Sequence, residues 1–296
     1  MGQKGIILLT CSEFPEGTPD DQLLAQVFKS QGIFVQFKIW DQLSPKQIPS
    51  SAIVIVRSMW DYHKKISHLK KWLQEAKSTN LSLFNSIDCI LWNLSKIYLQ
   101  ELEQKKIPIV PTLFLKKTDL PRFQNEVESQ AWDEIVIKPE ISASAFKTFR
   151  LKTKDISAHW EEICSIWKEC DVLVQPFCEE IVREGEFSLL FFNDGKEHHY
   201  SHAVVKKPKS QDFRVQEDHG GTTEFYHAPP ALVQYGKSVL KFVPHDWLYA
   251  RIDVVNYRGH YVLGELELFE PQLFFRFHSE AAPLFVKCVL KRLEGQ

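Results

Sequence analysis

Residues 249–268, near the end of the chain, have the sequence YARIDVVNYRGHYVLGELEL. Apolar and polar residues alternate on both sides of a central turn, and this alternation predicts a β-hairpin. Arg251 and Asp253 lie two residues apart and therefore on one face of their strand. Glu265 and Glu267 share a face of the second strand for the same reason.

Carboxylates crowded on one face of a sheet raise the free energy of the fold unless a cation neutralises them. A hard cation bound by oxygen ligands meets this need, and Mg²⁺ is the usual cation beside phosphate groups. The hairpin therefore predicts a magnesium site at Asp253, Glu265 and Glu267. The alternative interpretation is that the three side chains lie on a solvated sheet face.

Strand and helix signals alternate in the first part of the chain. Apolar runs at Ile6–Thr10, Ile33–Ile39 and Ile53–Arg57 predict buried strands. Asp20–Ser30 and Ile66–Lys77 carry apolar residues at helical spacing. Such alternation favours a parallel sheet that is covered by helices.

The pattern changes further along the chain. Leu94–Lys105 predicts a helix, and Glu134–Lys138 and Val172–Gln175 predict short buried strands. Phe187–Phe192 and His199–Lys206 flank an Asp-Gly pair, which is a strong hairpin signal. The second half of the chain is therefore expected to contain an antiparallel sheet.

The composition narrows the class of partner. A formal net charge of −2 argues against a general nucleic-acid binder. No apolar run reaches the roughly 20 residues of a membrane span, and the first apolar run is too short for a signal peptide. The six cysteines are scattered without metal-binding spacing, as expected for reduced thiols. We expect a cytoplasmic protein with small-molecule partners.

One lysine stands out from the solvated lysines elsewhere in the chain. Lys138 ends the apolar run Ile135–Ile137 and precedes a stretch of small residues, Ser142–Ala145. A lysine at the end of a buried strand can bind phosphate as a point charge. Phosphoryl transfer needs several cations near metal ligands, and Lys206, Lys207 and Arg214 supply them before the acidic hairpin. A solvent-exposed turn is an equally good interpretation of the small residues alone.

A series of short stretches follows one another in a fixed order. They are Trp92–Lys96, Val136–Pro139, Val174–Phe177, Gly185–Leu189, Asp212–Gln216, Gly220–Gly221, Ala250–Asp253 and Gly264–Glu267. In this order they resemble the ATP-grasp superfamily over nearly the whole chain. They are most similar to the glutathione-synthetase-like branch, which includes the cyclo-ligase that closes O-ureido-serine to cycloserine.

The resemblance implies an ATP-grasp fold of the α/β (α+β) class. Residues 1–93 would form an N-terminal lobe with an open parallel sheet, and residues 94–178 a central lobe that covers adenine. Residues 179–296 would form a C-terminal lobe with an antiparallel sheet and the metal site.

The resemblance also implies an ADP-forming ligase that uses ATP and two Mg²⁺ ions. The enzyme would join a carboxylate to an amine through an acyl phosphate, on a small amino-acid-like or peptide substrate. The alternatives are a kinase-like ATP-grasp enzyme that stops after phosphorylation and a catalytically silent nucleotide-binding protein. The resemblance leaves open which acid and which amine are joined, and whether the product is a ring or an intermolecular amide. It also leaves open whether the protein forms a homodimer.

Residue roles follow from the same resemblance. Lys96 and Lys138 would contact the nucleotide phosphates, and Arg214 would act with Lys138 on the transferred phosphate. The remaining nucleotide-binding residues would be Ser142 and Ser144 in the phosphate loop, Gln175, Pro176 and Phe177 at the adenine hinge, and Glu186 near the ribose. Asp253, Glu265 and Glu267 would bind magnesium.

The substrate side is expected at the end of the strand Ile53–Arg57, because open α/β sheets bind ligands at such strand ends. A buried tryptophan beside a salt bridge is an equally good interpretation of this segment. The candidate substrate residues are Arg57, Trp60, Asp61 and Tyr62, with Gly220 and Gly221.

The chain departs from the ATP-grasp pattern at two places. The phosphate loop of the superfamily is usually rich in glycine, but Ser142–Ala145 contains none. The last metal ligand is commonly asparagine, whereas this position carries Glu267. An additional carboxylate suits two divalent ions or alters the metal preference.

Overall fold

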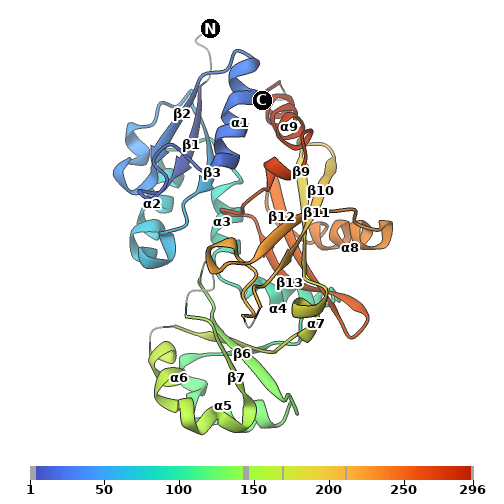
Figure 1. Cartoon of the computed structure of the whole chain (residues 1–296). Helices are drawn as coiled ribbons and strands as arrows, with labels where there is room; N and C mark the ends of the chain where they lie inside the picture. Colours follow the sequence, from blue (N-terminus) through green and yellow to red (C-terminus); the bar gives the residue numbers. More distant parts are fainter. Residues whose placement is uncertain (1–4, 143–146, 169, 211, 295–296) are drawn as a thin grey trace.

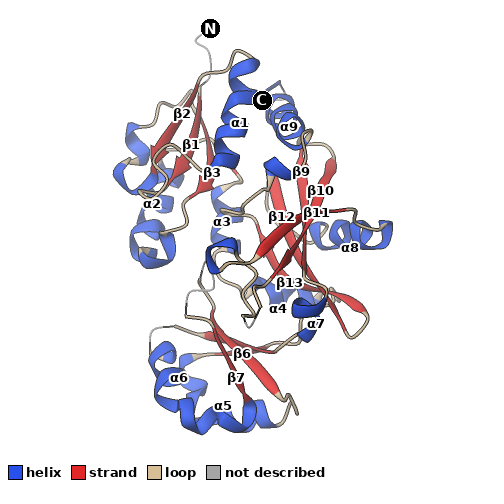
Figure 2. Cartoon of the chain, viewed as in Figure 1, coloured by secondary structure: helices blue, strands red, loops and turns tan. Residues whose placement is uncertain are grey.

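The computed structural model describes all residues except 1–4, 143–146, 169, 211 and 295–296. The described residues form three β-sheets with helices packed around them (Figures 1 and 2). Each sheet contributes one wall to the candidate site. The lobe boundaries expected from the sequence, 1–93, 94–178 and 179–296, stay a proposal.

The first sheet is parallel and has the strand order β2-β1-β3-β4. Its strands are rich in apolar residues because helices cover the sheet, and every residue of β1 and β3 is buried. Helix α1 begins with a capping box in which the Thr18 and Asp21 side chains bond each other's backbone N–H. The elements are β1 (Ile6–Thr10), α1 (Pro19–Ser30), β2 (Val35–Ile39), β3 (Ile53–Ser58), α2 (Ile66–Ser78), β4 (Leu83–Phe84) and α3 (Ile87–Asn93).

The central sheet is antiparallel, with the order β5-β8-β6-β7, and lies at the bottom of Figure 1. Its apolar core is separate from the others and includes Phe123, Ile137, Ile163, Trp167 and Val174. The elements are β5 (Leu113–Leu115), α5 (Phe123–Glu128), β6 (Glu134–Pro139), β7 (Phe149–Lys152), α6 (Trp160–Trp167) and β8 (Val172–Pro176).

The third sheet is antiparallel, with the order β11-β10-β9-β12-β13. Helix α8 packs on it, and the C-terminal helix α9 lies beside α1 of the first sheet (Figure 1). The elements are α7 (Glu179–Arg183), β9 (Glu186–Asn193), β10 (His198–Lys207), β11 (Thr222–Tyr226), α8 (Pro230–Leu240), β12 (Tyr249–Tyr257), β13 (His260–Glu267) and α9 (Ala281–Glu294). The expected mixed α/β fold, with a parallel sheet followed by antiparallel strands, is confirmed.

The buried side chain of Asn85, directly after β4, joins the first sheet to the third. Its Nδ2 donates to the carbonyl oxygens of Tyr249 at 2.8 Å and Leu268 at 2.7 Å. Its Oδ1 accepts from the backbone N–H groups of Leu248 at 2.7 Å and Tyr249 at 3.1 Å. The two sheets also share one apolar core, which runs from Leu8 in β1 to helix α9.

The expected helix Leu94–Lys105 is wrong at its beginning. Helix α3 ends at Asn93, and the next helix, α4, runs over Tyr98–Gln104. Asn93 explains the break, because its side chain donates to Leu266 O at 2.8 Å and accepts from Leu268 N at 2.7 Å. The interruption brings Lys96 into the candidate site. Within the described residues, no helix has both the length and the apolar character needed to cross a membrane.

Candidate active site

Strands β12 and β13 bring the predicted metal-binding carboxylates together. Their register places Asp253 opposite Glu265 and Arg251 opposite Glu267. Asp253, Glu265 and Glu267 each offer a carboxylate oxygen, and these oxygens all lie within 4.8 Å of one another. Mg²⁺ prefers oxygen ligands of this kind, so the donor set fits the expected ion.

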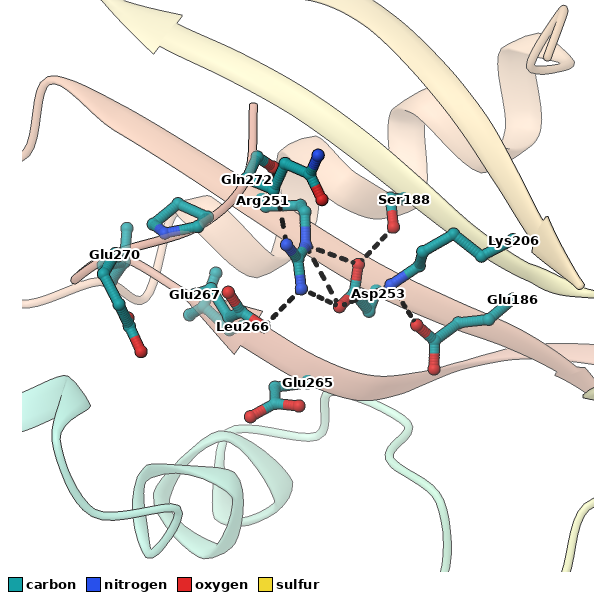
Figure 3. A network of polar contacts seen from close by, with 12 residues as sticks. Glu186, Ser188, Lys206, Arg251, Asp253, Glu265, Leu266, Glu267, Glu270 and Gln272 are labelled. Carbon is teal, nitrogen blue, oxygen red and sulfur yellow. Dashed lines mark hydrogen bonds and ion pairs between the residues drawn. The ribbon is translucent and has the colours of Figure 1, made fainter. Parts of the chain in front are cut away.

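Cationic side chains compensate these carboxylates (Figure 3). Arg251 Nη2 donates to Asp253 Oδ2 at 2.9 Å and also to Glu267. Lys206 Nζ lies 3.3 Å from Asp253 Oδ2 and 2.5 Å from Glu186 Oε1. Buried charges are tolerated when they are paired in this way. Arg251 and Lys206 therefore hold the acidic cluster in place.

The same contacts separate the pKa values of the carboxyl groups. Burial would raise the pKa of Asp253, but Arg251 and Lys206 lower it to about 2. Burial raises the pKa of Glu267 to about 8, although Arg251 opposes the rise. Asp253 is therefore ionised at neutral pH, whereas Glu267 exchanges a proton near neutral pH. A divalent cation that binds Glu267 would displace that proton.

Two lysines approach the cluster from the central part of the chain. Lys96 Nζ lies 3.1 Å from Glu265 Oε1 and donates to Ser142 O at 2.9 Å. Lys138 lies on β6, where burial lowers its pKa and Glu265 partly offsets the effect. Cations that face carboxylates across a cavity form a suitable site for metal-bound phosphate. Ser144, which was expected in the phosphate loop, lies outside the described residues.

A cavity of about 610 Å³ connects these groups. Strands of the central and third sheets and the loops that follow β1 and β3 of the first sheet contribute to its lining. The hinge expected to bind adenine lines the cavity, at the end of β8. The candidate nucleotide and metal residues on its wall are Lys96, Lys138, Ser142, Gln175, Pro176, Phe177, Glu186, Arg214, Asp253, Glu265 and Glu267.

The ring of Phe177 forms a supported flat wall of the cavity. The Arg150 guanidinium carbon lies 3.5 Å from the centre of this ring, and Glu134 holds Arg150 at 2.6 Å. The Phe213 ring meets Phe177 edge to face, with 6.4 Å between ring centres. Offset and edge contacts of this kind are the stable arrangements for aromatic rings. The orientation of the Phe177 ring at the cavity wall is therefore fixed by its neighbours.

The loop between β10 and β11 contributes Arg214, whose Nη2 donates to Asp212 Oδ2 at 2.7 Å. Gly220 and Gly221 belong to the same loop, but they do not line the cavity. A Cβ atom on Gly221 would lie 2.3 Å from Val215 O. The structure thus places the two glycines, which were expected on the substrate side, in the packing of the loop.

Known proteins resemble this chain in sequence and in fold. Residues 6–85 match the family described as D-cycloserine synthetase DcsG, N-terminal domain. The cycloserine biosynthesis protein DcsG of Streptomyces lavendulae is 23% identical over 262 residues, which cover 81% of this chain and 83% of that protein. The crystal structure of D-cycloserine synthetase DcsG superposes with a TM-score of 0.84 at 20% identity, over 98% of this chain and 100% of that chain.

A further structure is that of the ATP-grasp ligase PsnB complexed with a minimal precursor, Mg and ADP. It has a TM-score of 0.62 at 13% identity, and the match covers 97% of this chain and 98% of that chain. The chain has the fold of the ATP-grasp ligases. This confirms the resemblance and the fold class expected from the sequence, and the expected class of enzyme agrees with these relatives.

The ATP-grasp fold does not place all the expected substrate residues on the cavity. Trp60 and Tyr62 line it, but Arg57 and Asp61 do not. Arg57 Nε donates to Asp21 Oδ1 at 2.9 Å in a buried ion pair. The Asp61 carboxylate instead contacts Trp40 and Lys65, which do not line the cavity either. The position of the segment at the end of a strand therefore placed its aromatic residues correctly, whereas Arg57 and Asp61 form ion pairs and hydrogen bonds within the fold.

Asp61→Asn should lower stability without changing substrate affinity. Asp61 accepts the Trp40 indole N–H at 2.8 Å and lies 2.6 Å from Lys65 Nζ. The loss of one charge-assisted hydrogen bond costs about 2 kcal/mol of unfolding free energy. Urea unfolding measures this cost, and KM values from steady-state kinetics should stay at those of the wild type. If the KM for the substrate rises and the unfolding free energy is unchanged, Asp61 contributes to the substrate site and this prediction is wrong.

Sequence reasoning gave no site role to Arg251 or Glu270, although both line the cavity. Arg251 could have been found, because it shares the face of Asp253 and a buried carboxylate cluster requires a cation. Glu270 lies three residues after Glu267 and beyond the end of β13. Strand periodicity does not extend past the strand, so the sequence offered no signal for the orientation of Glu270.

Proposed function

We propose that this protein is an ADP-forming ligase that uses ATP and Mg²⁺ to join a carboxylate to an amine. The observation that carries the proposal is the meeting of the three-carboxylate cluster with Lys96, Lys138 and Lys206 around one cavity. Phosphoryl transfer relies on positioned cations and metal ligands rather than on a nucleophilic side chain. The structure of the ATP-grasp ligase PsnB, which has the same fold, contains Mg and ADP, and this supports nucleotide and metal binding by the fold.

The cavity divides into a nucleotide side and a substrate side. We place the adenine against Phe177 and the hinge, and the phosphates between Lys96 and Lys138. Asp253, Glu265 and Glu267 would hold two Mg²⁺ ions, which supply charge neutralisation at the β- and γ-phosphates. Arg251 and Lys206 keep the three carboxylates aligned.

The first chemical step forms an acyl phosphate. An oxygen of the substrate carboxylate attacks the γ-phosphorus, the bond from that phosphorus to the bridging oxygen breaks, and ADP leaves. Lys138 and Arg214 stabilise the negative charge on the transferred group. Arg214 must first exchange its contact with Asp212 for the phosphate.

The second step forms the amide. The amine nitrogen attacks the acyl carbon, a C–N bond forms, and the C–O bond to phosphate breaks. Phosphate leaves with the proton that the amine gives up. A kinase-like enzyme would stop before this step, so consumption of the amine distinguishes a ligase from a kinase.

The size of the cavity favours a small substrate. About 610 Å³ is within the range for one drug-sized ligand, so little room remains beside a nucleotide. We therefore propose an amino-acid-like substrate or a short peptide. A cytoplasmic location is part of the proposal.

ATP with Mg²⁺ should raise the melting temperature of the protein. A ligand at about a thousand times its dissociation constant stabilises the folded state by about 4 kcal/mol. Thermal-shift measurements at millimolar ATP, with and without Mg²⁺, test this expectation. An ADP-release screen over amino acids, dipeptides and ureido amino acids then tests the ligase reaction. No shift with ATP and Mg²⁺ would contradict the proposed function.

A further inference from the structure

The substrate side of the cavity has an aromatic wall. Trp60 and Tyr62 follow β3 of the first sheet, and Phe14 follows β1. The Phe14 and Trp60 rings meet edge to face at 5.3 Å, and Tyr62 meets Phe269 in the same way at 4.9 Å. These interlocked contacts fix the rings. All four residues line the cavity.

A buried carboxylate lies against this wall. Glu270 is only 8% exposed, and it lines the same cavity. The Trp60 indole N–H donates to the backbone oxygen of Glu270 at 2.9 Å and thereby fixes the position of the residue. The Tyr62 hydroxyl interacts with the Glu270 carboxylate. Figure 3 shows this carboxylate apart from the contacts of Arg251.

Glu270 differs from its acidic neighbours because it has no ion-pair partner among the residues that the structure describes. Burial raises the pKa of the Glu270 carboxyl to about 7, and Lys96 only partly opposes the rise. An ammonium ligand in contact with this carboxylate would supply the charge that stabilises its ionised form. Its neighbours are each paired: Asp253 and Glu267 with Arg251, Glu265 with Lys96, and Glu186 with Lys206.

The surroundings of Glu270 define the charge and size of its ligand. The faces of Trp and Tyr rings attract cations, and a carboxylate attracts them more strongly. A compact ammonium group satisfies both features, whereas an anionic ligand group would be repelled. The Glu270 carboxylate is also close enough to Glu265 for their charges to interact. The ammonium position is therefore adjacent to the carboxylate cluster.

We propose that Glu270, Trp60 and Tyr62 form an ammonium subsite that holds the amino group of an amino-acid substrate. The subsite rests on the proposed function, and it names the substrate class. An α-amino acid carries its ammonium one carbon away from its carboxylate. A ligand anchored at Glu270 would therefore place its carboxylate near the position proposed for the metal-bound γ-phosphate, beside Asp253 and Glu265. The anchored ammonium has no lone pair, so the attacking amine is a different nitrogen.

Glu270→Gln tests this subsite, because it removes the charge and keeps the shape. We expect the KM for an accepted amino acid to rise about 100-fold and the KM for ATP to stay within about twofold, since a buried charge contact to the substrate is lost. Wild type should prefer an amino acid over its 2-hydroxy acid by about 100-fold, and the variant by less than about tenfold. The melting temperature without ligands should be unchanged or higher, because the substitution removes a buried carboxyl that has no ion-pair partner among the described residues.

The control variant is Glu197→Gln, in the exposed turn between β9 and β10, which should match wild type in every measurement. Amino-acid binding is also followed by thermal shift without nucleotide. If the protein binds an amino acid in a way that requires Glu270 but does not bind ATP, the proposed function is rejected and the subsite stands. ATP binding without any amino-acid binding would reject the subsite alone. An unchanged preference for amino acids in Glu270→Gln, with or without lower stability, would overturn the subsite.

Discussion

Glu265→Gln is expected to lower kcat by about a hundredfold or more while the dissociation constant for ATP changes little. Glu265 lies opposite Asp253 in the β12–β13 hairpin, at the centre of the carboxylate cluster. Its loss would misplace the γ-phosphate, and in-line transfer is sensitive to displacements of about 1 Å. The loss of one electrostatic stabiliser has an effect of this size in other enzymes. Steady-state ADP release and nucleotide titration measure the two quantities separately.

The matched control is Glu267→Asn, which restores the residue that ATP-grasp proteins commonly carry at this position. We expect it to keep kcat within about tenfold of wild type, because asparagine still offers an oxygen ligand. Excess Mg²⁺ should restore part of the activity of Glu265→Gln. Wild-type turnover in Glu265→Gln would mean that the carboxylates line a sheet face without a catalytic role.

Asp253→Asn is expected to lower the unfolding free energy by about 3–5 kcal/mol, in addition to its effect on turnover. Arg251 Nη2 and Lys206 Nζ both contact its carboxylate, and the Ser188 hydroxyl donates to it at 2.5 Å. The variant would leave these cations buried without full compensation. Urea unfolding of the ligand-free protein gives the difference directly.

The surface variant Asp88→Asn provides the comparison for Asp253→Asn. Asp88 lies 2.6 Å from Lys77 Nζ, but both side chains are more than half exposed. Exposed ion pairs contribute less than about 1 kcal/mol. If the two variants lose the same unfolding free energy, the burial of Asp253 does not make its ion pairs more important for stability than an exposed ion pair.

Alternation of residues along the strands was enough to predict that the carboxylates of the last hairpin lie together. A strand has a period of two, so Arg251 and Asp253, and likewise Glu265 and Glu267, could be placed on shared faces before the register was known. The structure adds that the two pairs stand directly opposite each other. That pairing depends on the turn and on an irregularity after Asp253, which composition does not encode.

Charges near a strand end were harder to interpret. Arg57 and Asp61 have the same local signals as Trp60 and Tyr62, yet only the aromatic pair lines the cavity. The partners of the two charged residues are Asp21 for Arg57 and Trp40 and Lys65 for Asp61. Most of these partners are distant in sequence, and a single sequence contains no information on such contacts. For the same reason, Glu270 could be recognised only after the first and third sheets were seen together.

The amide of Asn85 has a consequence for the order in which ligands leave. Because it joins the first sheet to the third, and the two share one core, these sheets behave as one packed unit. The central sheet packs mainly on its own core, although Leu173 of β8 joins the core of the third sheet. The segments that connect the central sheet to the rest of the chain are therefore the place where an opening motion breaks the fewest apolar contacts. Such a hinge would uncover the proposed adenine position at Phe177 and leave the aromatic wall at Trp60 in place. Spent nucleotide would then depart first, and the organic product would follow from a pocket that keeps its shape.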